Sequence, residues 1–138
     1  MPDLHTRIAA SFARQGMMTT FGAQLAAVAQ GRVEIVAPIL PGSTQQQGYG
    51  HAALTFALGD TAAGYAALSL LPDEQEVVTA EIGIHLLAPA VGDLLVARGR
   101  VVKPGRRLIV VQSEVFAVTD GVEKQIALLN GTMVPVAA

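Results

Sequence analysis

AALTFALGDTAAGYAALSLL, residues 52–71, is a run of helix-forming residues that is apolar on nearly every side and carries one ionisable group, Asp60. A helix without a polar face must be covered all round by the rest of the chain. The run is about as long as a membrane span, but it is rich in Ala and Gly. A carboxylate at mid-membrane depth also costs roughly 2.5–3.5 kcal/mol. We therefore expect a buried central helix and no membrane partner.

Strand patterns lie on both sides of this run. The β-branched residues of 32–40 predict a strand that ends at Pro41-Gly42. Apolar and polar residues alternate with a period of two after the helix, and Pro and Gly mark the turns between the segments. These four strands are the one that begins at Val77, then 94–103, 106–119 and 123–136, the last with a bulge at Gly131. Their short connections favour antiparallel pairing.

The N-terminal part is expected to form an arm. Residues 3–14 have apolar side chains at helical spacing, and 17–29 predict a second short helix or an irregular segment that Gly31 ends. Residues 1–138 show no linker or internal repeat, so we predict one domain. Its class is α+β, with an antiparallel sheet of five or more strands wrapped around one long central helix.

Composition restricts the function. The 138 residues are 51% hydrophobic and 14% charged, with a net charge of -2 and no cysteine. A thiol nucleophile, disulfides and thiolate metal sites are thereby excluded. The absence of a basic arm argues against nucleic acid. The start, MPDLHTRIAA, does not have the pattern of a signal peptide, so we expect a cytoplasmic protein. Low charge and open sheet edges predict a homodimer or homotetramer.

Asp60 and the segment before the helix are the candidates for chemistry. Burying an unpaired carboxylate costs several kcal/mol, so packing alone does not select Asp60. It either accepts structural hydrogen bonds or serves as a base that activates water. His51 follows Gly48-Tyr49-Gly50 and immediately precedes the helix. A lone histidine is more often structural, but the first amides of a helix have no internal acceptors and can bind an oxyanion.

These residues resemble a known signature. QQQGYGHAALTFALGDTAAG, residues 45–64, is similar to the signature of PaaI-type hotdog thioesterases, with Gly48 and His51 matched and Asp60 nine residues after His51. The segments 78–93 and 11–25 also resemble the family's strand and N-terminal arm. Two departures stand out. The family's His-Gly-Gly is His-Ala-Ala here, and Gln45 replaces an Asn.

The resemblance implies a hotdog fold and hydrolysis of a small or medium acyl- or aryl-CoA to the free acid and CoA. Asp60 would be the general base or nucleophile and would act across a subunit interface. The Ala52 N–H would polarise the thioester oxygen, and His51 would support that loop. Gln45 would help to hold the water or the carbonyl, and Thr79 would lie near the water. No metal or cofactor is implied, since CoA is part of the substrate.

Lys103, Arg106 and Arg107 surround the turn at Pro104-Gly105. Exposed turn cations are usually only solvated, but the planar fork of arginine also recognises phosphate, so we expect these three to bind CoA.

Three other functions remain as alternatives. The departures at Gln45 and in His51-Ala52-Ala53 allow a non-catalytic acyl-CoA-binding protein. A hotdog dehydratase or hydratase would typically carry Asp-x-Asn-x-x-His, a spacing that this sequence lacks. A purely structural assembly would leave Asp60 unexplained.

Overall fold

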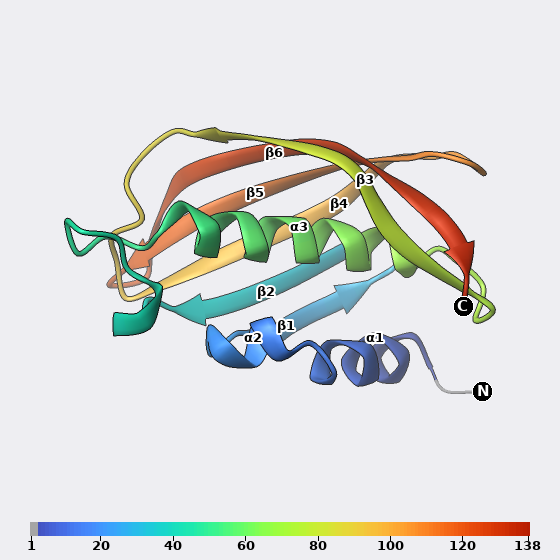
Figure 1. The fold of residues 1–138 in the computed structure, drawn as a ribbon, viewed down its shortest axis with the longest axis horizontal. Helices are drawn as coiled ribbons and strands as arrows, with labels where there is room; N and C mark the ends of the chain where they lie inside the picture. The colour runs from blue at the N-terminus through green and yellow to red at the C-terminus, as the bar shows by residue number, and fades with distance from the viewer. Residues whose placement is uncertain (1–2) are drawn as a thin grey trace.

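One antiparallel sheet curves around one long helix in the computed structural model, which describes residues 3–138 (Figure 1). The strands lie in the order β1-β2-β4-β5-β6-β3, and every neighbouring pair is antiparallel. The elements are α1 (Leu4–Ala13), α2 (Gly16–Thr20), β1 (Gln24–Ala29), β2 (Arg32–Pro38), η1 (Pro41–Ser43), α3 (Ala52–Leu68), β3 (Gln75–Leu86), β4 (Leu94–Pro104), β5 (Ile109–Thr119) and β6 (Val122–Ala137). The predicted α+β class and the central helix are confirmed, with six strands.

The helix α3 lies in the concave side of the sheet and supplies much of the core. Leu54, Leu58 and Ala62 are fully buried there. The helix has 17 residues and ends at Leu68, three residues earlier than the sequence pattern predicts, because Ser69 caps it. The Ser69 hydroxyl donates to the Ala66 carbonyl and accepts from the Gly31 N–H. In the described part of the chain, no helix combines the length and the apolarity that a membrane crossing requires.

The side of α3 that faces the sheet approaches it closely at Gly99 of β4. A Cβ on Gly99 would lie 2.3 Å from the carbonyl carbon of Ala62. Real side chains do not approach backbone atoms this closely, so the helix rests on β4 through a glycine and an alanine. The closeness of this contact fixes how deeply α3 lies in the sheet.

Gly99→Ala is therefore expected to destabilise the protein by about 3 kcal/mol, since the clash is with backbone that cannot turn away. Gly64→Ala is the matched control, because its Cβ would be 4.0 Å from the Met133 Cε and the change favours the helix by about 0.5–1 kcal/mol. Urea unfolding at one protein concentration measures both effects. Equal midpoints for Gly99→Ala and the unmodified protein would contradict this account of the packing.

The arm formed by α1 and α2 lies beside β1 and the open side of α3 (Figure 1). Ile8, which lies on α1 itself, is fully buried in the hydrophobic core. The guanidinium of Arg7 donates to the carbonyl oxygens of Leu71 at 2.6 Å, Pro72 at 3.0 Å and Gln75 at 2.9 Å. These three bonds fix α1 to the connection between α3 and β3.

Two predicted features of the chain are wrong. Residues 24–29 form strand β1 rather than part of an irregular arm, and they pair with β2 through the turn at Gly31, whose φ is 75°. Gly131 is no bulge, because it pairs regularly on both sides. The bulge of the last strand lies at Ile126 instead, and β3 has its own bulge between Thr79 and Glu81. Gly131 has another role, because a Cβ there would lie 2.4 Å from the Glu81 carbonyl oxygen. Glycine allows β3 to approach β6 beside the bulge.

Candidate active site

The N-terminus of α3 is capped by the residue that precedes it. His51 has extended backbone angles, and its Nδ1 accepts a hydrogen bond from the Ala53 N–H at 2.8 Å. The Leu54 N–H donates to the His51 carbonyl at 2.9 Å. Among residues 3–138, no acceptor bonds the Ala52 N–H, and Ala52 is exposed. One amide at the positive end of the helix dipole is thus free to bind an oxygen.

The loop before α3 is held by its own backbone. The His51 N–H donates to the Ser43 carbonyl at 2.8 Å, and the Gly50 N–H donates to the Ala90 carbonyl at 2.9 Å. Gly48 has a φ of 84°, which favours glycine. The Gln45 carboxamide turns back into the loop, where its Oε1 accepts from the Tyr49 N–H at 3.3 Å. Gln45 therefore shapes the loop and lies in the same pocket as His51.

We call this first cavity the amide pocket. It has a volume of about 530 Å³ and is lined by the loop from Gln45 to Ala52, by Thr55, and by the segment from Leu86 to Ala90. Leu86 and Leu87 are both 56% exposed although they are apolar. The pocket is therefore open on the side where β3 ends.

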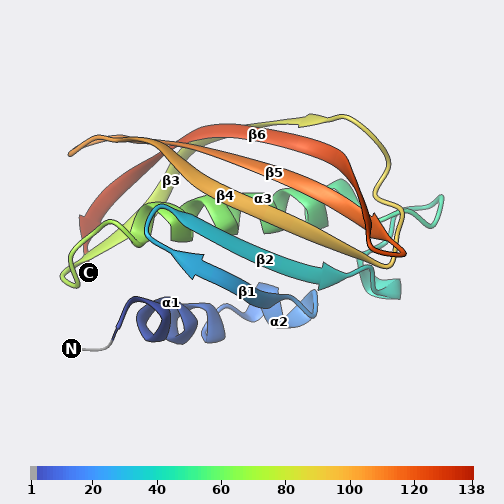
Figure 2. The same ribbon diagram turned by 180° about the vertical axis from the view of Figure 1, so that it is seen from behind.

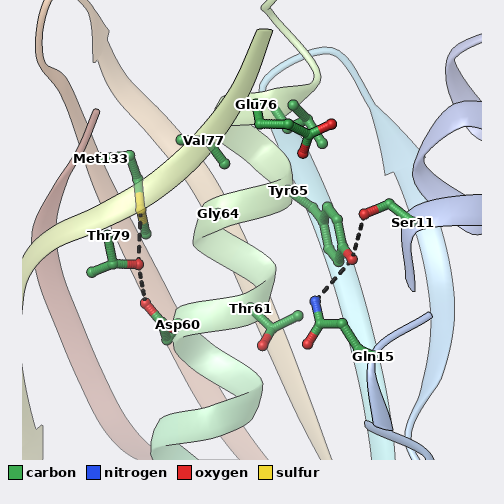
Figure 3. A pocket seen from close by; sticks show the side chains of 11 residues that line it. Ser11, Gln15, Asp60, Thr61, Gly64, Tyr65, Glu76, Val77, Thr79 and Met133 are labelled. Atoms are coloured by element: carbon green, nitrogen blue, oxygen red, sulfur yellow. Dashed lines mark hydrogen bonds between the residues drawn. The ribbon is translucent and has the colours of Figure 1, made fainter. Parts of the chain in front are cut away.

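Asp60 lines a different cavity, the acid pocket, of about 280 Å³. Its Oδ1 accepts a hydrogen bond from the Thr79 hydroxyl at 2.8 Å (Figure 3). The same hydroxyl lies 3.2 Å from the Met133 sulfur. A carboxylate is the stronger acceptor, so the single hydroxyl proton points to Asp60. The lone pairs of Thr79 Oγ1 then remain available to accept from a water beside the carboxylate.

The expectation that Asp60 is enclosed on every side is wrong for the single chain. Its side chain is half-buried, and Thr79 beside it is exposed. The helix surface that includes Thr61 and Gly64 is also only partly covered. The physical reason is that β3 is the last strand of the sheet, so nothing lies beyond it in one chain.

Within one chain the structure does not bring the predicted site residues together. Asp60 is eight residues after Ala52 on the same helix, which separates their backbones by roughly 12 Å along its axis. The acid pocket contains Asp60 and Thr79, and the amide pocket contains Gln45, His51 and Ala52. A carbonyl bound at the free amide is thus out of reach of the carboxylate on its own helix.

The predicted CoA-binding cations lie elsewhere. Lys103, Arg106 and Arg107 are exposed around the turn between β4 and β5. None of the three lines the acid pocket or the amide pocket. Figure 2 shows this turn at the end of the molecule opposite the loop that precedes α3.

Nine of the eleven residues that line the acid pocket were not predicted, among them Ser11, Gln15, Tyr65 and Glu76. Tyr65 could have been found, because Asp60, Thr61, Gly64, Tyr65 and Leu68 recur at the spacing of one helix face. Nothing in the local pattern of Ser11 and Gln15 shows that α1 turns back over this face.

Proteins of similar sequence and structure indicate the family of this chain. A family model described as "Thioesterase superfamily" matches residues 47–124. A thioesterase family protein from Silicibacter pomeroyi is similar in structure with a TM-score of 0.95 and 38% sequence identity, over 99% of this chain and 100% of that one. A comparison with curated proteins gave no match.

Two more distant structures show the fold alone. A thioesterase from Haemophilus influenzae has a TM-score of 0.84 at 20% identity, over 99% of this chain and 92% of that one. The PaaI protein of E. coli, from the phenylacetic acid degradation operon, has a TM-score of 0.86 at 21% identity, over 98% and 94%. The resemblance seen in residues 45–64 and the predicted hotdog fold are confirmed. The enzyme class of this family also argues against the binding-only, dehydratase and structural alternatives.

The family model matches more than half of the chain, and the Silicibacter protein is similar along its whole length. The structure agrees with this, since a carboxylate lines a pocket on the helix that begins with a free amide. This chain therefore belongs to the thioesterase superfamily and is a thioester hydrolase.

Proposed function

We propose that the protein hydrolyses the thioester of a small acyl-CoA to the free acid and CoA, with Asp60 as the general base. The observation that carries this proposal is the Asp60–Thr79 pair, a carboxylate and a hydroxyl 2.8 Å apart in an open pocket. The free amide of Ala52 supplies the second requirement, a donor for the carbonyl oxygen. Because these groups are roughly 12 Å apart in one chain, the site needs a second copy.

In the proposed reaction, a water held by Thr79 and Asp60 attacks the carbonyl carbon of the thioester. Asp60 takes a proton from this water as the carbon–oxygen bond forms. The negative charge that develops on the carbonyl oxygen accepts a hydrogen bond from an Ala52 N–H. Collapse of the tetrahedral intermediate breaks the carbon–sulfur bond. The proton then passes from Asp60 to the thiolate sulfur, so that the carboxylate is regenerated and CoA leaves as the thiol.

The free edge of β3 is the surface through which we propose that two copies associate. In residues 3–138, β3 pairs only with β6, so its other edge presents unpaired backbone groups. Val78 is 50% exposed and Leu86 is 56% exposed on this strand. Antiparallel pairing of two β3 strands would bury these apolar side chains and make one continuous sheet.

The position of the symmetry axis decides which pockets meet. If the two-fold axis passes beside Gly83, so that Gly83 faces its own copy, Thr79 lies opposite the partner subunit's Leu87. Thr79 lines the acid pocket and Leu87 lines the amide pocket. This register therefore joins the acid pocket of each chain to the amide pocket of the other, and two equivalent composite sites result.

Mixing two inactive variants tests this composite site. Asp60→Asn removes the base, and Ala52→Pro removes the free N–H. If each site combines Asp60 of one chain with Ala52 of the other, a mixed dimer contains one intact site. The isolated mixed dimer, with one intact site of two, should then show about half of the full activity. Co-expression with two different affinity tags gives the mixed dimer, and free-thiol release from a panel of acyl-CoAs measures its activity.

Each variant expressed alone with both tags is the control for that experiment. If the mixed dimer stays as inactive as these controls, the groups do not act across subunits. If the unmodified protein hydrolyses none of the short-, medium- and long-chain and aryl CoA esters, the proposal as a whole is wrong.

The turn cations give a separate prediction. If Arg106 and Arg107 bind the phosphates of CoA, changing both to Ala should raise KM for an acyl-CoA about ten-fold. It should leave KM unchanged for the same acyl group on pantetheine, which has no phosphate. Lys124→Ala, which removes an exposed cation of β6, is the control. Equal changes with both thioesters would show that the two arginines do not bind phosphate.

A further inference from the structure

The side of the acid pocket opposite Asp60 is a wall of three polar side chains (Figure 3). The Gln15 Nε2 donates to the Tyr65 hydroxyl at 2.8 Å, and the hydroxyls of Tyr65 and Ser11 lie 3.0 Å apart. Tyr65 is five residues after Asp60 on α3, roughly 7.5 Å further along the axis. The wall thus joins α3 to the arm at a fixed distance from the carboxylate.

This wall is held firmly in place. The Tyr65 side chain is 5% exposed, and its ring lies 6.2 Å from that of Phe12, centre to centre. One helical turn before Ser11, Arg7 fixes α1 to three backbone carbonyls. A wall anchored from both sides can set the depth of the pocket and the chemistry of its end.

Some hydrogen-bonding groups of the wall have no partner among residues 3–138. One of the two hydroxyls donates to the other, which leaves one hydroxyl proton without an acceptor among residues 3–138. The Gln15 Oε1 has no donor among these residues either. No buried side-chain nitrogen or oxygen in the described chain lacks a partner, so the unpartnered Gln15 Oε1 is open to solvent, and Gln15, Ser11 and Tyr65 all line the pocket. An apolar group placed against them would leave them unsatisfied.

The charge of the pocket is negative. Glu76 is half-buried and lines it together with Asp60, and none of the lining residues is Lys or Arg. A ligand carboxylate would face two like charges without a cation to balance them. The volume of about 280 Å³ lies at the small end of ligand pockets, which usually have about 300–1,000 Å³.

We propose that Ser11, Gln15, Tyr65 and Glu76 determine which acyl groups the protein accepts. The wall takes a small acyl group whose far end is an uncharged hydroxyl, which it bonds through Ser11, Gln15 and Tyr65. It rejects an acyl group that ends in a carboxylate, because Glu76 repels it. This inference rests on the proposed function for its place in the reaction, since it treats the acid pocket as the acyl site.

The test compares three series of acyl-CoAs of graded length, which end in a hydroxyl, in a methyl at the same position, or in a carboxylate. At the length that reaches the wall, kcat/KM for the hydroxyl ester should exceed that of its methyl counterpart by about ten-fold. Tyr65→Phe combined with Ser11→Ala should bring this ratio close to one. A merely structural role would lower kcat/KM for both esters alike and leave the ratio unchanged.

Glu76→Gln tests the charge. It should raise kcat/KM for the carboxylate ester about ten-fold relative to the methyl ester. Glu74→Gln removes an exposed carboxylate two residues away and should leave that ratio unchanged. If Glu76→Gln and Glu74→Gln behave alike, Glu76 does not select against acids.

Binding separates this inference from the proposed function. Calorimetry with Asp60→Asn protein measures affinity for the same esters without turnover. If the unmodified protein hydrolyses the esters but shows no preference for the hydroxyl, the inference is wrong and the proposed function stands. If the hydroxyl ester binds about ten-fold more tightly but no ester is hydrolysed, the inference stands and the proposed function is wrong. If no ester is bound or hydrolysed, both are wrong.

Discussion

Asp60→Asn is expected to lower kcat by roughly 10²–10⁴-fold while changing KM little, because it removes the base that accepts the proton of the attacking water. Asparagine keeps the shape of the side chain, and its carbonyl oxygen can still accept the Thr79 hydroxyl that now lies 2.8 Å from Asp60 Oδ1. The loss therefore reports on the base rather than on the pocket. Free-thiol release under saturating acyl-CoA measures it.

Asp93→Asn is the matched control. Asp93 is exposed, and its Oδ2 accepts the Asp120 N–H at 3.0 Å, a bond that asparagine can retain. This variant should keep full activity. Asp60→Asn protein that hydrolyses acyl-CoA as fast as the unmodified enzyme would remove Asp60 from the reaction and would require another base.

Ala52→Pro is expected to lower kcat by about 10²–10³-fold, because proline has no N–H to donate to the oxyanion. The helix should survive, since Ala52 is its first residue and proline is favoured at that position. His51 also has a φ of -66° and a ψ of 146°, the extended conformation that a residue before proline prefers. Circular dichroism and kinetics on the same sample check both statements.

Ala52→Gly provides the comparison, because glycine keeps the N–H and removes the methyl group. It should be at least as active as the unmodified protein. Full activity of Ala52→Pro with an intact helix would show that the oxyanion is bound elsewhere. The Ala53 N–H is no substitute donor, because it already bonds the His51 Nδ1 at 2.8 Å.

Most of the fold could be predicted from the sequence, because the pattern along each element follows from what covers it. The segment 52–68 has no polar face and lies in the concave side of the sheet, and the later strands alternate as half-buried strands do. Strand β1 was missed for a physical reason. Its sequence QLAAVA contains three alanines and only one β-branched residue, so edge pairing with β2 decides its conformation rather than local preference.

The candidate site was predicted only in part. The sequence indicated a helix that begins after His51 and carries an acid at Asp60, and both features are present. The separation of the acid pocket from the amide pocket depends on how the sheet ends at β3, which no local pattern encodes. The contact of Gln15 with Tyr65 joins residues 50 positions apart, so it too depends on the tertiary fold.

The close seating of α3 on Gly99 has a consequence for redesign. A library that varies the side of the helix facing the sheet, at Ala62 and its neighbours, would mostly yield unfolded clones, because no space exists there for a larger side chain. Randomisation confined to Thr61 and Gly64, which are only partly covered, alters the opposite side, where the acid pocket provides room. Selection for new acyl preferences can therefore proceed on one side of α3 while the other preserves folding.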